Sequence, residues 1–371
     1  MSKVEWKTIS SICVPLKKET LKQSELIDEG QYAVINSGTG VYGFYNRYNN
    51  EGNVLVVASR GENAGYISFM NQRFWAGGLC YPYRSKNEDC VLTKFLYYYL
   101  KSKEEQIMDT LVARGSIPAL NKVDFDNYKV PIPASFDEQR QIVSQLDIFT
   151  TLIAKLESEL TLRQKQYEHY REELLNFEGD EEVKWKELGK FAHKETQRNK
   201  LRLDYPAYSI TQGGLVPTRD FFKEKTNVTS KDTSTYFVVH KHWFVYSPSR
   251  IDVGSINYLR VEGPVIVSPI DVVFSINADE CTPEYLYYFL TSHMGMKQIM
   301  NNREGVEGMG RKNLPFERFA SIKVPIPSPD EQDRIVSQLD TFEQLIAALK
   351  REIALRRKQY DYYREKLLTF E

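Results

Sequence analysis

Two stretches of the chain repeat each other without a gap. Residues 142–178 read IVSQLDIFTTLIAKLESELTLRQKQYEHYREELLNFE, residues 335–371 read IVSQLDTFEQLIAALKREIALRRKQYDYYREKLLTFE, and 24 of the 37 positions are identical. This level of identity indicates an internal duplication rather than chance. A Pro-Ile-Pro triplet and a Glu-Gln pair precede each copy, at 131–133 with 138–139 and at 325–327 with 331–332.

Apolar and aromatic residues recur in each copy at alternating spacings of four and three. They are Ile142, Leu146, Phe149, Ile153, Leu156, Leu160, Tyr167, Tyr170 and Leu174 in the first, and Ile335, Leu339, Phe342, Ile346, Leu349, Ile353, Tyr360, Tyr363 and Leu367 in the second. Five heptads without Pro or Gly predict a helix of about 55 Å with one apolar seam. We expect the two helices to pair antiparallel as a coiled coil, because each seam needs a partner and the other copy supplies one.

Matched ends would place Ile142 opposite Phe370 and Phe177 opposite Ile335. Arg163 and Arg356 would interrupt the seams near the middle, where a charge lowers stability but can fix register. The alternative is that each helix packs only on its neighbouring domain.

The duplication extends upstream of the helices. Residues 4–7 match residues 183–186, and the aromatic run at 95–100 matches that at 285–290. This predicts the order domain, helix, domain, helix, with boundaries at 1–130, 131–179, 180–324 and 325–371.

Both domains are predicted to be mixed and strand-rich. Short β-branched and aromatic runs at 53–58, 236–239 and 265–267 lie between glycine turns, and the domains end in helices at 93–111 and 283–300. The fold class is therefore α+β, with two mixed α/β domains joined by two long helices. The middles of the two domains do not align by eye. Two modules that read different targets would diverge in this way, and so would a drifting structural domain.

Composition is that of an ordinary globular protein. The chain has 371 residues, 49 Lys and Arg against 50 Asp and Glu, and 42% hydrophobic residues. The longest nearly apolar stretch, 265–276, is too short to span a membrane, and the start has no signal-peptide core. Cys13, Cys80, Cys90 and Cys281 show no disulfide-like or zinc-like spacing. We expect a cytoplasmic, reduced protein without a membrane partner.

Charge is distributed unevenly along the chain. The net charge is +2 for residues 1–130, −4 for 131–178, +2 for 179–324 and −1 for 325–371, so the domains rather than the helices suit a polyanion. Basic and amide side chains in glycine-punctuated loops are candidates for contacts with bases and phosphates. The DNA-binding candidates are Arg60, Asn63, Arg73, Arg84, Arg114, Ser116, Gln212, Arg219, Lys241, Arg250, Arg260, Arg303, Arg311 and Lys312. For each one, a solvated surface residue is the alternative.

Catalytic signatures are absent from the sequence. The nearest approach to a phosphate loop, 305–312, has Gly-Arg-Lys where Gly-Lys-Ser/Thr is required. His240 and His242 flank a lysine and have no nearby Cys or carboxylate set for a metal. The triplet Glu-Val-Lys at 182–184 has the catalytic pattern Glu-x-Lys, but it lies in an acidic linker and no Pro-Asp precedes it. We predict no catalytic residue, no metal site and no cofactor in this chain.

The doubled motifs Pro-Ile-Pro, Glu-Gln, Ile-Val-x-Gln-Leu-Asp-x-Phe and Lys-Gln-Tyr-x-x-Tyr-Arg-Glu-x-Leu-Leu-x-Phe resemble those of the DNA specificity subunit of type I restriction-modification systems. The resemblance covers the whole chain, with recognition domains at 1–130 and 180–324 and spacer helices at about 137–178 and 330–371. Shorter phrases also resemble the family, at 60–65, 74–75 and 114–116 in the first domain and at 208–211, 247–250 and 268–269 in the second.

The resemblance implies a noncatalytic subunit of a methyltransferase or restriction complex. Each recognition domain would read one half of a bipartite, asymmetric target on double-stranded DNA, and the helix pair would set the spacer and dock two methyltransferase subunits. Restriction or translocase subunits can join that core, and the partners would supply S-adenosylmethionine, ATP and Mg²⁺ chemistry. The tandem four-residue repeats that adjust spacing in some members are not visible at 156–161 or 349–354. The sequence leaves the target bases and the spacer length open.

Two other classes compete with this interpretation. A noncatalytic scaffold could assemble partner subunits through the same helices without reading DNA. A self-contained nuclease or methyltransferase conflicts with the missing motifs.

Overall fold

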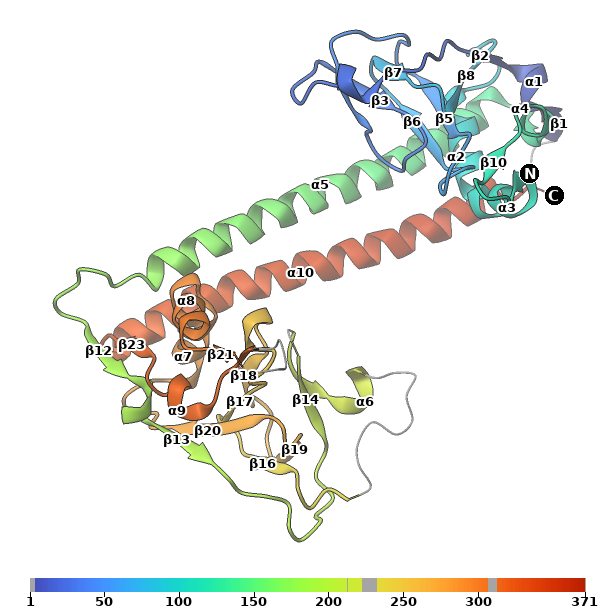
Figure 1. Cartoon of the computed structure of the whole chain (residues 1–371). Helices are drawn as coiled ribbons and strands as arrows, with labels where there is room; N and C mark the ends of the chain where they lie inside the picture. Colours follow the sequence, from blue (N-terminus) through green and yellow to red (C-terminus); the bar gives the residue numbers. More distant parts are fainter. Residues whose placement is uncertain (1–3, 212, 222–231, 306–311, 371) are drawn as a thin grey trace. The chain divides into compact units, whose positions relative to one another are not determined.

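The chain folds into two compact units, each of which contains part of both long helices. The computed structural model describes residues 4–211, 213–221, 232–305 and 312–370 (Figure 1). Unit 1 comprises residues 1–158 and 350–371, and unit 2 comprises residues 159–349. The two predicted helices are confirmed as α5 (Phe136–Leu174) and α10 (Pro329–Leu368), which end a few residues before the sequence repeats do.

The remaining elements of unit 1 form the first domain. The strands are β1 (Val4–Thr8), β2 (Cys13–Pro15), β3 (Tyr32–Ile35), β4 (Gly43–Tyr45), β5 (Val54–Ala58), β6 (Ile67–Met70), β7 (Phe74–Ala76), β8 (Cys80–Ser85), β9 (Val112–Ala113), β10 (Ala119–Leu120) and β11 (Lys129–Pro133). The helices are α1 (Ile9–Ile12), α2 (Thr93–Ser102), α3 (Glu104–Leu111) and α4 (Lys122–Asp126), with a 3-10 turn at Gln23–Glu25.

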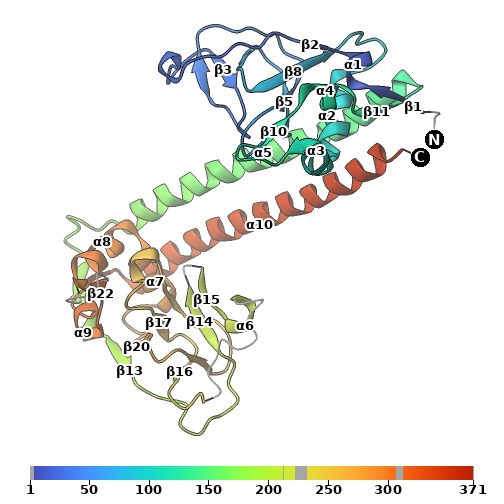
Figure 2. The ribbon, with the colours of Figure 1, turned by 45° about the vertical axis from the view of Figure 1, so that its right-hand side comes forward.

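Two sheets and a ribbon organise this domain. Four antiparallel strands run in the order β2-β8-β5-β6, and three run in the order β4-β3-β7 with β3 and β7 parallel. Strand β1 pairs antiparallel with β11, which leads directly into α5, so the domain begins and ends at one place. The first turns of α5 lie beside α2 (Figure 2). There Ile142 and Leu146 belong to the domain core together with residues of α2.

The remaining elements of unit 2 form the second domain. The strands are β12 (Lys184–Glu187), β13 (Ala192–Glu195), β14 (Tyr208–Thr211), β15 (Gly214–Pro217), β16 (Phe237–Val239), β17 (Phe244–Tyr246), β18 (Ile256–Tyr258), β19 (Val265–Val267), β20 (Val272–Ile276), β21 (Glu304–Gly305), β22 (Lys312–Asn313) and β23 (Lys323–Ile326). The helices are α6 (Thr218–Phe221), α7 (Pro283–Thr291), α8 (His293–Asn301) and α9 (Phe316–Phe319), with 3-10 turns at Leu188–Lys190 and Ile251–Val253.

The two domains share their main sheet, although their sequences do not align by eye. The second domain has four antiparallel strands in the order β13-β20-β17-β18, which matches β2-β8-β5-β6 strand for strand, and β12 pairs with β23 as β1 does with β11. The second layer is divided differently into sheets, since β14 pairs with β15 and β16 with β19, whereas β4, β3 and β7 form one sheet. Its strand directions agree, because Ala207 forms a parallel bridge with Ile266 of β19 as β3 does with β7, and Asn50 forms an antiparallel bridge with Phe74 of β7 as β16 does with β19. The duplicated frame is therefore preserved in both layers.

Each predicted domain-ending helix is broken into two. Lys103 separates α2 from α3, and Ser292 separates α7 from α8. Ser292 is buried, and its hydroxyl accepts a hydrogen bond from Gly295 N, which caps α8. A Cβ at Gly295 would lie 2.1 Å from Phe289 O, so the close approach of the two helices requires glycine there.

The long helices pair antiparallel in both units. Phe149 stacks on Tyr363 in unit 1 with 5.3 Å between ring centroids, and Tyr170 stacks on Phe342 in unit 2 with 5.4 Å. Both pairs follow the register in which residue 142 faces residue 370, which confirms the predicted pairing. An ion pair between the helices supports it, from Arg357 Nη2 to Glu157 Oε1 at 2.5 Å.

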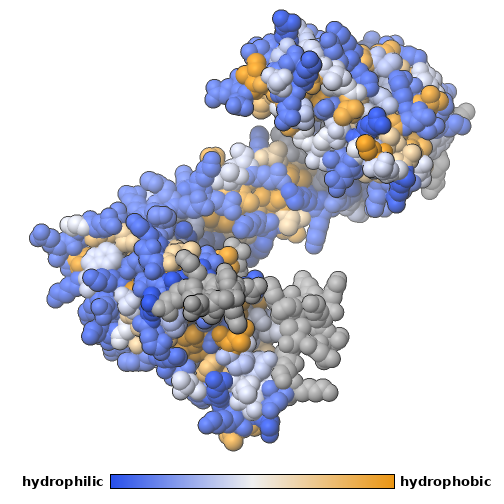
Figure 3. Space-filling view, viewed as in Figure 1, coloured by the Kyte–Doolittle hydropathy of each residue, from blue (hydrophilic) through white to orange (hydrophobic). Residues whose placement is uncertain are grey.

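The predicted seam positions are all buried or half-buried except Tyr170 and Tyr363. These two exposed rings are the tyrosines of the stacked pairs. Arg163 and Arg356 are half-buried and make the same contacts in the two units, each with a glutamate four residues earlier and a glutamine three residues later. Their charges are therefore neutralised within their own helix. Polar residues dominate the face in Figure 3, and apolar residues come to the surface along the helices. Within the described ranges, no helix has the length and apolar character that crossing a bilayer requires.

Asp271, in the turn between β19 and β20, predicts a pH-dependent stability. The residue is 7% exposed, and burial raises the pKa of its carboxyl from 3.8 to about 7. Because the folded pKa lies above the unfolded one, ionisation disfavours the folded state; the cost is absent below pH 3.8, grows as the pH rises, and is complete above about pH 7. We expect Asp271→Asn to raise the free energy of unfolding at pH 8 by about 2–4 kcal/mol.

Denaturant unfolding at pH 8 and pH 4 measures this difference. The gain should vanish at pH 4, and the exposed neighbour variant Asp279→Asn should show no such pH-dependent gain. Equal effects of Asp271→Asn at both pH values would contradict the prediction.

Candidate nucleic-acid interface

In unit 1, the loop that follows β5 runs beside the β9–β10 hairpin. Ser59 O accepts from Leu120 N, and Gly61 N donates to Pro118 O, both at 2.9 Å. Gly61 has a φ of +92°, a left-handed conformation that favours glycine. Arg60 is exposed at this edge, and its side chain makes no hydrogen bond or ion pair with the residues that the structure describes.

Three further candidates lie at the same edge. Asn63 is half-buried in the Arg60 loop, and Ser116 is exposed at the tip of the hairpin. Arg114 is also exposed at the tip and forms an ion pair with Asp109 at 2.6 Å. The fold thus brings Arg60, Asn63, Arg114 and Ser116 together on one loop and one hairpin.

Unit 2 repeats this construction with different side chains. Leu314 N donates to Pro248 O at 3.2 Å, the counterpart of the contact between Leu120 and Ser59. Arg250 follows in this loop and is exposed. The neighbouring hairpin is β21–β22; its tip, which includes Arg311, lies outside the described residues, and only the backbone of Lys312 is described.

Arg303 anchors the loop that carries Arg250. Its side chain is 6% exposed, forms an ion pair with Asp252 at 2.8 Å, and donates to Ser249 O at 3.4 Å. The sequence predicted that Arg303 contacts DNA from a loop, but its side chain is buried. An acid and a main-chain carbonyl of the Arg250 loop hold its guanidinium.

Two other candidate arginines, the half-buried Arg84 and the exposed Arg260, make hydrogen bonds within their own domains. Arg84 on β8 is half-buried and donates to Gly52 O at 2.6 Å and Asn53 O at 3.3 Å. Arg260 donates to the Tyr258 hydroxyl at 3.0 Å and to Asn257 Oδ1 at 2.9 Å. Both use their guanidinium groups to tie strands or loops of their own domain.

The remaining candidates that the structure describes are also at the surface. Arg73 donates to Glu51 at 2.7 Å, holds the pKa of that carboxyl below its ordinary value, and lies over the Tyr48 ring. Lys241 pairs with Glu262, and Arg219 is 92% exposed on α6. Gln212 lies outside the described residues.

Sequence reasoning missed a basic loop after β13. Arg198, Lys200 and Arg202 are exposed there, and Leu201 between them is 82% exposed. Arg202 has a φ of +51°, which is uncommon for a residue other than glycine. No glycine marks this loop, so the search for glycine-punctuated loops did not find it.

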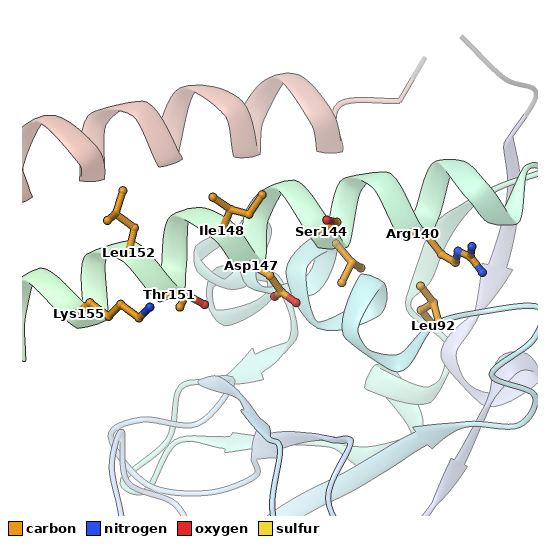
Figure 4. Close-up of a pocket in the computed structure, with 9 residues that line it drawn as sticks. Leu92, Arg140, Ser144, Asp147, Ile148, Thr151, Leu152 and Lys155 are labelled. Atoms are coloured by element: carbon orange, nitrogen blue, oxygen red, sulfur yellow. The ribbon is translucent and has the colours of Figure 1, made fainter.

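A groove of about 590 Å³ lies along α5 in unit 1 (Figure 4). It is lined by Leu92, Arg140, Val143, Ser144, Asp147, Ile148, Thr151, Leu152 and Lys155. Apart from Leu92, which precedes α2, these residues recur every three or four positions on a face of α5 other than the seam. Ile148 is 63% exposed, so the groove presents apolar surface to solvent. The seam pattern in the sequence does not indicate this second face.

The corresponding face of α10 in unit 2 is similar. Four of the eight α5 groove residues are identical at the matching positions, which are Val336, Ser337, Asp340 and Leu345. Leu345 is 40% exposed. The two helices therefore present related surfaces, one in each unit.

The described residues form no metal-binding group. No three His, Cys, Asp or Glu side chains in these ranges come together in a way that could hold an ion. The His240 ring contacts Trp243 and lies within hydrogen-bonding distance of Gln197. All four cysteines are free, and Cys13, Cys80 and Cys281 are buried.

Comparison with known proteins agrees with these features. A family model, the type I restriction modification DNA specificity domain, matches residues 1–162 and 178–355. The chain therefore belongs to this family.

The relatives cover most of the chain. The specificity subunit of the type I restriction enzymes EcoR124I and EcoR124II of Escherichia coli is 27% identical over 359 residues, covering 87% of this chain and 84% of the relative. The MjaVIII specificity subunit of Methanocaldococcus jannaschii is 24% identical over 330 residues, covering 82% and 75%. The crystal structure of a type I restriction-modification S subunit from M. genitalium covers 100% of this chain and 97% of its own with a TM-score of 0.71. At 19% sequence identity this last likeness concerns the fold.

Proposed function

We propose that this chain is the sequence-specific DNA-binding subunit of a type I restriction-modification complex. The domains at 1–130 and 180–324 each read one half of a bipartite target, and the helix pair sets the spacer between the halves. The chain carries no catalytic step, and its methyltransferase partners supply S-adenosylmethionine chemistry. Because the target is double-stranded DNA, we place this work in the cytoplasm. One observation carries the proposal: a loop beside a hairpin recurs at the same place on the shared sheet of both domains, with different side chains.

The exposed arginines of these loops are suited to base readout. Arg60 and Arg250 are exposed on loops that backbone hydrogen bonds fix to the neighbouring hairpin. An arginine can donate two hydrogen bonds to O6 and N7 of guanine in the major groove. The hairpin residues Arg114 and Ser116 and the basic loop at 198–202 are suited to phosphate contacts, which position a protein on DNA without reading it.

The related faces of α5 and α10 support docking of two methyltransferase subunits. A partner present in two copies needs the same surface twice, and the duplicated helices offer one such face in each unit. An exposed apolar strip beside charged residues, as in the α5 groove, is typical of a protein interface. Restriction subunits join through these partners.

Methylation mapping tests the proposal. The chain is coexpressed with a type I methyltransferase subunit from the same genome in a host without DNA methylation, and modified adenines are mapped by single-molecule sequencing. We expect a split, asymmetric motif with a constant gap. A soluble, co-purifying complex that methylates nothing would instead favour a scaffold that assembles partners without reading DNA.

The same readout tests the two arginines. We expect Arg60→Ala and Arg250→Ala each to relax one position, in different half-sites, and to weaken binding to the cognate duplex by about 1–3 kcal/mol. Arg334→Ala removes an exposed charge from α10 and should leave the motif unchanged. An intact motif in Arg60→Ala would exclude that side chain from base readout.

A further inference from the structure

Each long helix is held to its domain by two polar contacts, eight residues apart. In unit 1, Gln139 is 1% exposed; its amide accepts from Leu92 N at 3.1 Å and donates to Cys90 O at 3.0 Å. Further along α5, Asp147 accepts a hydrogen bond from the Tyr98 hydroxyl at 2.5 Å. The glutamine thus hydrogen-bonds to the loop before α2, and the aspartate hydrogen-bonds to α2 itself.

Unit 2 has the same contacts at the matching positions. Gln332 is 2% exposed; its amide accepts from Thr282 N at 2.9 Å and donates to Glu280 O at 3.1 Å. Asp340 accepts from the Tyr288 hydroxyl at 2.6 Å. The two occurrences lie in separate units, so the pattern is a repeated design of the fold and not a single local contact.

Apolar residues lie between the two polar contacts. Ile142 and Leu146 on α5, and Ile335 and Leu339 on α10, are at most 3% exposed in the cores of their domains. Apolar burial supplies attraction but is not directional. Hydrogen bonds are directional, and two of them about 12 Å apart along a helix oppose both tilting and rotation.

The residues around these contacts differ between the two units, so the contacts that both units share can be told apart from the rest. Lys94 pairs with Asp147 at 2.8 Å in unit 1, whereas the matching residue in unit 2, Glu284, accepts from Tyr258. Burial and the neighbouring carboxylates raise the pKa of Tyr98 and of Tyr288, so both phenols remain donors at physiological pH. The shared set is glutamine, aspartate and tyrosine.

We infer that Gln139, Asp147 and Tyr98, with Gln332, Asp340 and Tyr288, are positioning residues that determine how strictly the protein demands one spacing between its half-sites. This inference rests on the proposed function. One base pair more or less moves a half-site by about 3.4 Å and turns it by about 35°. A protein bound to both half-sites can follow that change only if its domains tilt or rotate on the long helices. The hydrogen bonds of these residues oppose both movements.

Removing the two tyrosine hydroxyls tests the inference in the full chain with its methyltransferase partner. The variant Tyr98→Phe/Tyr288→Phe keeps both rings and their packing. Binding is measured to duplexes that carry the mapped half-sites at the native gap and at gaps one base pair shorter and longer. We expect the preference for the native gap over the altered gaps to fall at least tenfold, with the base preference within each half-site unchanged.

Tyr167→Phe is the matched control. Its hydroxyl donates to Glu343 at 3.0 Å and therefore joins helix to helix rather than domain to helix. It should keep the wild-type gap preference. An unchanged gap preference in the double variant would overturn the inference, and so would a loss of gap preference accompanied by loss of base preference. Wild-type protein without any fixed gap would instead refute the proposed function, so the two failures are distinguishable.

Discussion

Duplicating Leu156–Glu159 in α5 and Leu349–Glu352 in α10 together should lengthen the gap in the DNA target by one to two base pairs and leave both half-sites unchanged. Four helical residues add about 6 Å of length and a net turn of about 40°. A base-pair step adds about 3.4 Å and about 35°. The added length alone corresponds to nearly two base pairs, and the added turn to one.

The seam tolerates this change only when both helices carry it. Each duplication starts with a seam leucine, so apolar residues continue at spacings of three and four, with a local stutter in the supercoil. The stacked pairs Phe149–Tyr363 and Tyr170–Phe342 lie on either side of the inserted turns and can both re-form. With only one helix lengthened, one pair must slip by a turn.

Methylation mapping reads the new gap directly. The single insertions are the controls and should lose methylation of any fixed motif. A double insertion that methylates the original motif at the original gap would show that the helices do not set the spacing.

The helices and their register were predictable because both follow from local patterns. Residues at spacings of three and four give the seam, and the internal duplication states which ends match. From these alone, residue 142 was placed opposite residue 370, and the stacking of Phe149 on Tyr363 confirms that register. An internal repeat supplies the long-range information that a single amphipathic helix lacks.

The shared sheet could not be seen in the same way. Strand pairing is made by main-chain groups, and β5 and β17 occupy the same place with the different sequences VLVVA and FVY. The break at Ser292 was missed because the apolar pattern continues across it, although a serine before a possible helix start is a capping signal. The frame is thus conserved in geometry while its sequence has drifted.

The candidate site was predictable only in part. Arg60 and Arg303 both belong to loops or strand ends with neighbouring glycines, and the sequence alone treats them alike. The structure separates them, because Asp252 and Ser249 O capture the guanidinium of Arg303, whereas Arg60 remains exposed. Such capture depends on groups about fifty residues away, which no local pattern contains.

A single glutamate in the α5 groove should remove one of two methyltransferase subunits from the complex. Ile148 is 63% exposed and lines the groove in unit 1, and Leu345 is 40% exposed on the matching face of α10 in unit 2. Both can accept a charge without entering a core. In a formed interface, however, Ile148→Glu or Leu345→Glu would bury an unpaired carboxylate against the partner, which is strongly unfavourable.

The expected result is stepwise. The wild-type chain should bind two methyltransferase subunits, each single variant should bind one, and the double variant should bind none at concentrations that saturate the wild type. Disrupting a hot spot at the centre of an interface costs about 2 kcal/mol or more, which is about thirtyfold in affinity. Native mass spectrometry of the purified complexes counts the subunits.

Val123→Glu is the matched control, because Val123 is 60% exposed on α4 of the first domain and does not line the groove. It should keep two bound subunits. If the single variants also keep two, the partners dock elsewhere. If either single variant loses both, the two sites are coupled, and the related faces of α5 and α10 do not act as independent copies of one docking surface.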